Sequence, residues 1–131
     1  MQVDRRQFLE YVGAVTVTSV LASPAEASGM YGLITKMTTV PGKREEMIAI
    51  LKESAAGMPA CFSYVVAKDS ADENAVWVTE VWDSIASHDA SLSLPAVKNA
   101  IPRAQALISS FGKIAVTTPV WGVGLPTAHT H

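Results

Sequence analysis

Residues 75–97 read Ala-Val-Trp-Val-Thr-Glu-Val-Trp-Asp-Ser-Ile-Ala-Ser-His-Asp-Ala-Ser-Leu-Ser-Leu-Pro-Ala-Val, and the fold is organised around them. The first eight are rich in β-branched and aromatic residues and contain no Gly or Pro, which is typical of a strand. Ser84 can cap a helix that begins directly after this strand. Because side chains alternate along a strand, Glu80 and Trp82 should project from one face, next to a short polar helix that carries His88. A strand end beside a helix start is a common place for a pocket.

The rest of the chain supplies the other elements of one small domain. Strands are expected at Tyr31–Thr39, Ala60–Lys68, Ala75–Trp82 and Lys113–Val120. Helices are expected at Lys43–Ala56, at Ser84–Ala90, and from Leu94-Pro95 to Phe111-Gly112, where Pro102 should kink or break the helix. One apolar stripe of the first helix comprises Met47, Ile50, Leu51 and Ser54. The order β-α-β-β-α-β predicts an α+β, ferredoxin-like fold with both main helices on one face of the sheet.

The strands are apolar on both faces, which two helices cannot cover. Val65, Trp77 and Val81 should lie on the face away from the helices. Leaving such side chains in water forgoes roughly 1.5–3 kcal/mol for each large one. A second copy of the chain, packed sheet against sheet, is the simplest cover, so a homodimer is expected.

Composition excludes several classes of function. The chain has 131 residues, a net charge of −2 and 17 % charged residues, with no basic stripe, so a nucleic-acid partner is not expected. Cys61 is the single cysteine and cannot form an internal disulfide. The sequence has no Cys/His cluster at metal-ligand spacing, and His129 and His131 fall in a tail.

Residues 1–27 resemble a bacterial twin-arginine (Tat) export signal. Arg5-Arg6 is followed by Phe-Leu and then by an apolar run of about a dozen residues, short of the ~20 that span a bilayer. Ala25-Glu26-Ala27 provides the small residues at which a signal peptidase cleaves, before Ser28. The prediction is a periplasmic or secreted protein without a stable membrane span. Its domain would cover residues 28–125, with a core at 30–120 and a disordered tail at 126–131.

The motif Glu80-Val81-Trp82-Asp83-Ser84, followed by Ser87-His88-Asp89-Ala90-Ser91-Leu92, resembles the antibiotic-biosynthesis-monooxygenase (ABM) family. Within the family, the chain more closely resembles small bacterial members named quinol monooxygenases. The resemblance extends over about residues 30–120 and includes the turn at 40–43 and the segment 117–120. It implies a dimeric α+β barrel. Close relatives usually carry a histidine in the arm after the last strand, where this chain has Trp121-Gly122-Val123-Gly124-Leu125.

The resemblance also implies oxygenation without metal, flavin or other cofactor. A quinol-like or phenolic substrate is deprotonated and its anion passes an electron to dioxygen. In this chain His88 would be the base, since its ordinary pKa suits proton transfer at neutral pH. Trp82 would stack on the substrate ring, Tyr64 and Ser91 would donate hydrogen bonds to its oxygens, and Glu80 would orient His88 or a backbone group.

Other interpretations remain open from the sequence. The same fold could support an isomerase, a haem-degrading enzyme or a non-catalytic module that binds a small aromatic compound. Haem-degrading relatives use an Asn-Trp-His set, whereas Asn74 and Asn99 fall in a loop and on the long helix. The candidate residues could also have purely structural roles. His88 could cap a helix, Trp82 and Tyr64 could be core aromatics, and Glu80 could accept hydrogen bonds from helix-end amides. The Ser91 hydroxyl could bond within its own helix, and Arg103 could be a solvated charge.

Overall fold

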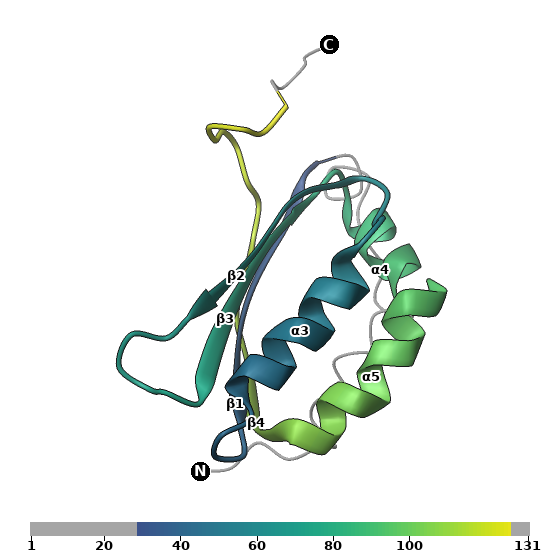
Figure 1. Cartoon of the computed structure of the whole chain (residues 1–131). Coiled ribbons are helices and arrows are strands. Elements are labelled where there is room, and N and C mark those ends of the chain that lie inside the picture. Colours follow the sequence, from purple (N-terminus) through teal and green to yellow (C-terminus); the bar gives the residue numbers. More distant parts are fainter. Residues whose placement is uncertain (1–28, 127–131) are drawn as a thin grey trace.

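A computed structural model describes residues 29–126, which form one antiparallel sheet with helices on one face (Figure 1). The strands are β1 (Tyr31–Thr39), β2 (Cys61–Lys68), β3 (Ala75–Trp82) and β4 (Ile108–Thr117), in the order β2-β3-β1-β4. The helices are α3 (Arg44–Ala55), α4 (Ile85–Ser91) and α5 (Pro95–Leu107). This is the ferredoxin-like α+β arrangement that the sequence predicts. The predictions for residues 1–27 and for the tail beyond residue 126 lie outside the described residues.

Side-chain alternation on β3 follows the predicted pattern. Val76, Val78, Glu80 and Trp82 are buried beneath the helices, whereas Trp77, Thr79 and Val81 face the other way and are more exposed. β1 pairs with β3 from Tyr31 to Thr38, so that Tyr31 lies opposite Trp82. Two aromatic rings are thereby brought to the end of the sheet where α4 begins.

The helices bury the stripes that their sequences predict. Met47, Ile50, Leu51 and Ser54 are the buried residues of α3. α4 begins after Ser84, whose Oγ accepts a hydrogen bond of 3.2 Å from the Ser87 amide. α3 packs beside α5 on the sheet, and their apolar side chains fill the space between helices and strands. α5 runs through Pro102 without a break.

The end of α5 and the start of β4 differ from the sequence prediction. The helix ends at Leu107, not at residues 111–112, and β4 begins at Ile108 rather than Lys113 and ends at Thr117 rather than Val120. Ile108 pairs with Thr39, and the Ser109 hydroxyl donates to the carbonyls of Thr38 and Thr39 at 3.2 Å each. By its spacing, Ile108 continues the apolar stripe of the helix that includes Leu107. In the structure its backbone is satisfied by pairing with β1, so tertiary contacts make this segment a strand.

The sheet face away from the helices carries exposed apolar side chains. Val65 opposes Thr79 on this outer face and is 52 % exposed. Ile114, 54 % exposed, extends over Gly112, which pairs with the outward-facing Lys36. The segment after β4 adds Val120, Trp121 and Val123, all largely exposed. The apolar outer face therefore exists as the sequence predicts.

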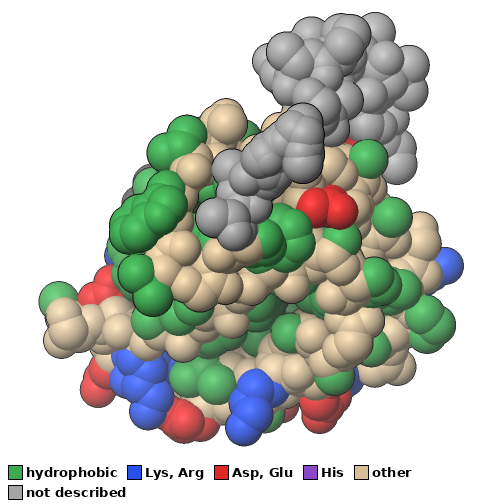
Figure 2. Space-filling model, turned by 90° about the horizontal axis from the view of Figure 1, so that it is seen from above, with side chains coloured by type: hydrophobic (Ala, Val, Ile, Leu, Met, Phe, Trp, Pro, Cys, Tyr) green, Lys and Arg blue, Asp and Glu red, His purple; other side chains and the backbone are tan. Residues whose placement is uncertain are grey.

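Charge is distributed without a strong bias on the face seen in Figure 2. Lys and Arg side chains alternate with Asp and Glu along one edge, and hydrophobic side chains occupy much of the remaining surface. Among the residues that the structure describes, no helix has the length and hydropathy needed to cross a membrane.

Candidate active site

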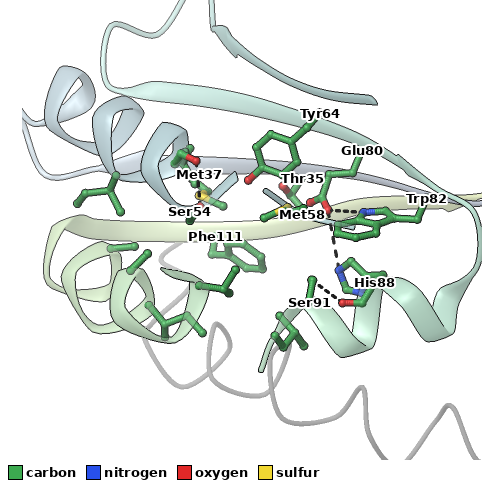
Figure 3. A pocket seen from close by; sticks show the side chains of 17 residues that line it. Thr35, Met37, Ser54, Met58, Tyr64, Glu80, Trp82, His88, Ser91 and Phe111 are labelled. Carbon is green, nitrogen blue, oxygen red and sulfur yellow. Dashed lines mark hydrogen bonds and ion pairs between the residues drawn. The ribbon is translucent and has the colours of Figure 1, made fainter. Parts of the chain in front are cut away.

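A cavity of about 90 Å³ lies between the sheet and the helices (Figure 3). The side chains around it are mostly apolar, with a few polar groups from three strands and two helices. All five residues predicted for a site, His88, Trp82, Tyr64, Glu80 and Ser91, line it. The other lining residues are Thr35, Met37, Ile50, Leu51, Ser54, Met58, Leu92, Val97, Ala100, Ile101, Ala104 and Phe111.

Glu80 brings a carboxyl group into this apolar space. It is only 8 % exposed, and its Oε1 accepts a hydrogen bond of 2.9 Å from the indole Nε1 of Trp82. Burial disfavours the charged form and raises the pKa of Glu80 from 4.5 to about 7, although the bond from Trp82 acts in the opposite direction. The hydrogen-bond donor to Glu80 is thus the indole of Trp82 on the same strand, not the helix-end amides of the alternative interpretation.

His88 approaches the same carboxyl from α4. Its Nε2 lies 3.9 Å from Glu80 Oε1, and its Nδ1 lies 3.3 Å from Asp89 Oδ1. An ionised carboxylate only accepts hydrogen bonds, so the contact with Asp89 favours the proton on Nδ1 and makes Nε2 the basic nitrogen. The His88 ring also meets the Trp82 ring edge-on, with centroids 5.5 Å apart, and lies 5.1 Å from the Tyr31 ring.

The surroundings of His88 keep its imidazole neutral at physiological pH. The residue is 2 % exposed, and this burial lowers the pKa of His88 below its usual value. Asp89 works against the shift and Lys113 adds to it. A neutral imidazole that lines a cavity can take a proton from a ligand.

Tyr64 and Ser91 present their hydroxyls differently. Burial raises the pKa of Tyr64 well above its usual range, and the nearby Glu80 charge adds to this effect. The phenol therefore stays protonated and can donate a hydrogen bond. Ser91 Oγ instead donates to the carbonyl of His88 at 2.6 Å, so its proton is used within α4 and the hydroxyl can only accept.

Three residues near the site were not singled out from the sequence. Tyr31 packs against His88, and burial raises its pKa to about 12. Asp89 contacts the histidine ring, and Thr35 lines the cavity with a buried hydroxyl. The pairing of Tyr31 with Trp82 could have revealed the first, because both strands are recognisable in the sequence; the other two carry no such signal.

The described residues offer no ligand set for a metal ion or for haem. Within residues 29–126, no three His, Cys, Asp or Glu side chains lie close enough together to hold a metal ion. Asn74 accepts a hydrogen bond from the Gly42 amide, at 3.1 Å, in a loop, and Asn99 lies on α5; neither lines the cavity. The described residues therefore do not assemble an Asn-Trp-His set around it.

Arg103 lies away from the cavity lining. Its Nη2 is 2.7 Å from Glu53 Oε1, which joins α5 to α3 across an exposed surface. It is therefore a solvated charge, as the sequence predicts, and it is paired with Glu53.

Comparison with known proteins gives a consistent picture. Residues 30–103 match the family described as antibiotic biosynthesis monooxygenase. A crystal structure from Chloroflexus aurantiacus J-10-fl, provisionally named an antibiotic biosynthesis monooxygenase, is 54 % identical; the match covers 74 % of this chain and 99 % of that one, with a TM-score of 0.72. A search among curated proteins found no match.

More distant structures share the fold. A protein from Caulobacter crescentus CB15, also provisionally named in this way, is 18 % identical with a TM-score of 0.66 over 74 % of this chain and 95 % of that one. One from Bacteroides thetaiotaomicron VPI-5482, with the same provisional name, is 18 % identical with a TM-score of 0.64 over 72 % and 93 %. At these identities the likeness concerns architecture alone.

Proposed function

Because this chain belongs to the antibiotic biosynthesis monooxygenase family, we propose that it is a cofactor-independent monooxygenase that oxidises a small quinol-like or phenolic compound with dioxygen. The observation that carries the proposal is the position of His88 Nε2, 3.9 Å from Glu80 Oε1 at the edge of an apolar cavity. A base and a carboxylate so placed suit the formation of a phenolate in a largely apolar cavity.

The proposed reaction balances without an added reductant. For a 1,4-quinol, loss of a proton gives an anion that transfers one electron to dioxygen, and the resulting radical pair combines at a ring carbon. Loss of water from the peroxide then leaves a hydroxyquinone. One oxygen atom enters the product, the other leaves as water, and the quinol supplies all four electrons.

Each site residue has a role in this scheme. His88, kept neutral by burial, takes the phenolic proton on Nε2. Ionised Glu80 then stabilises the imidazolium beside it, because opposite charges attract strongly where water is excluded. Tyr64 donates a hydrogen bond to a ligand oxygen, and Trp82 forms an aromatic wall while it holds Glu80 in place.

Oxygen uptake by the purified protein with a panel of 1,4-quinols tests the proposal. We expect saturable uptake of one O₂ per quinol and incorporation of one ¹⁸O atom from ¹⁸O₂ into the product. Addition of catalase should return no oxygen. Simple autoxidation would instead release hydrogen peroxide, from which catalase would return half of the oxygen consumed. Binding without uptake would favour a module that sequesters aromatics, and conversion without uptake would favour an isomerase.

We also propose that the protein works as a homodimer. A second copy would cover the exposed apolar outer face, which includes Val65 and Ile114, and the apolar segment at Trp121 would reach across the interface. In such a dimer, each copy would have its own cavity between sheet and helices, on the face of the sheet that points away from the interface.

Export through the Tat pathway remains a further proposal, based on the Arg5-Arg6 motif and the small residues before Ser28. Mass spectrometry of the periplasmic protein should then give Ser28 as the first residue. A full-length cytoplasmic product would refute it.

A further inference from the structure

Thr35, on β1, carries a buried hydroxyl in the cavity wall that no other described residue bonds. The residue is 1 % exposed, and its Oγ1 has no hydrogen-bond partner within residues 29–126. Two other hydroxyls on the lining are satisfied locally: Ser54 donates to Leu51 O at 2.9 Å and Ser91 to His88 O at 2.6 Å. Thr35 therefore differs from the serines that share its cavity.

Shape alone does not explain this hydroxyl. A valine has the same branched outline, suits a strand equally well and leaves no polar atom unmatched. Buried polar groups in proteins are almost always satisfied, so an unmatched one in a cavity wall indicates a partner that enters from the cavity.

We propose that Thr35 is a ligand-binding, specificity-determining residue whose Oγ1 hydrogen-bonds a second oxygen of the substrate. The inference rests on the proposed function for the chemical class of that substrate. His88 would meet the oxygen that loses its proton, and Thr35 would meet the other one.

The strand register sets the spacing of Thr35 and Glu80, whose carboxyl lies 3.9 Å from His88 Nε2. Glu80 on β3 lies opposite Leu33, and Thr35 is the next residue of β1 on the same face. Diagonal neighbours of this kind are roughly 7–8 Å apart along the sheet. Figure 3 shows Thr35 beside Glu80 on the sheet wall, with His88 approaching Glu80 from the helix side. Because His88 Nε2 lies next to Glu80, Thr35 and His88 can contact oxygens at opposite ends of one ring, as in a 1,4-dihydroxybenzene.

The size of the cavity limits how many rings it encloses. Its volume is about 90 Å³, whereas a cavity of about 150 Å³ in another protein holds one benzene molecule. Met37 and Met58 line the space, and methionine side chains adjust easily to a ligand. We therefore expect the cavity to hold one ring, so that any further ring of a ligand would lie outside it.

Anaerobic calorimetry tests the role of Thr35 without turnover. The probes are 1,4-dihydroxybenzene and phenol, with the wild type, Thr35→Val and Thr35→Ser. Loss of one hydrogen bond should weaken binding of the diol to Thr35→Val by about 3- to 10-fold. Binding of phenol should be unchanged, and Thr35→Ser should retain most of the affinity for the diol.

Three results would overturn the inference. These are equal weakening of both probes, no change for the diol, or no binding of the diol to the wild type. Binding of 1,4-dihydroxynaphthalene tenfold more tightly than the single-ring diol would contradict the size limit. Because binding is measured without oxygen, a selective Thr35 effect without oxygen uptake would refute the monooxygenase but not this subsite. Oxygen uptake by the wild type, with no selective effect of Thr35→Val on diol binding, would refute this subsite but not the monooxygenase.

Discussion

The indole nitrogen of Trp82 donates a 2.9 Å hydrogen bond to Oε1 of Glu80, two residues earlier on the same strand. Because residues i and i+2 share a face, the Glu-x-Trp sequence aims both side chains into the cavity. The bond satisfies the single polar atom of a fully buried tryptophan and fixes a carboxyl in apolar surroundings. A carboxyl held in this way should influence the stability of the fold and, under the proposed function, the reaction as well.

Replacement of Glu80 by Gln should stabilise the protein at alkaline pH. The folded-state pKa is about 7 against an ordinary 4.5, so the folded state binds more protons than the unfolded state between these values. Wild-type stability therefore falls as pH rises from 4.5 to 7. Glutamine keeps the acceptor for Trp82 and removes the ionisation. At pH 8 the free energy of unfolding of Glu80→Gln should exceed that of the wild type by up to about 3 kcal/mol.

Urea titrations at pH 4.5, 6 and 8 would measure this difference. It should become small at pH 4.5, where the carboxyl is protonated in the folded state and about half protonated in the unfolded state. Glu73→Gln, at an exposed position, serves as the matched control and should show little change. A constant difference at all three pH values would show that Glu80 does not titrate as described.

Substitution of His88 by Ala should abolish most of the activity. If Nε2 is the base, kcat should fall by roughly 10²–10⁴ in oxygen-uptake assays with an active quinol. Added imidazole should restore part of the rate by entering the space that the ring vacates. An unchanged kcat would remove His88 from the mechanism, and near-ultraviolet circular dichroism would show whether the core still packs.

The pH profile of kcat/KM should reflect the ionisation of Glu80. We expect the rate to rise through about pH 7, because the ionised carboxyl stabilises the imidazolium of His88. Trp82→Phe keeps an aromatic wall but removes the donor that holds the Glu80 pKa down, so its rise should move to higher pH. Rates corrected for autoxidation would show this shift, and a profile identical to that of the wild type would contradict it.

Much of the fold can be predicted because its strongest elements have local signals. β1 and β3 begin and end where composition places them, and the Ser84 cap marks the start of α4. The boundary at Ile108 could not be predicted in the same way. Leu107 and Ile108 continue the helical spacing, and only the pairing of Ile108 with Thr39 reveals a strand.

The candidate site divides along a similar line. Glu80 and Trp82 share a face by strand alternation, and the chain order brings His88 to them directly afterwards. Thr35 is more than forty residues away from them in sequence and is an ordinary strand residue by composition. Its position beside Glu80 depends on the β1–β3 register, and its unsatisfied hydroxyl depends on what packs above it.

Disruption of the outer sheet face should dissociate the proposed dimer. Val65 on β2 and Ile114 on β4 are both about half exposed on the face that a second copy would cover. In a symmetric dimer each substitution occurs twice, so Val65→Lys with Ile114→Lys would bury four unpaired charges. We expect the dissociation constant to rise roughly 100-fold or more, because a buried charge without a partner is strongly unfavourable.

Light scattering at micromolar concentration should report a dimer for the wild type and for Lys98→Glu, an exposed change on α5, but a monomer for the double variant. A wild type that stays monomeric would leave the outer face without the proposed partner.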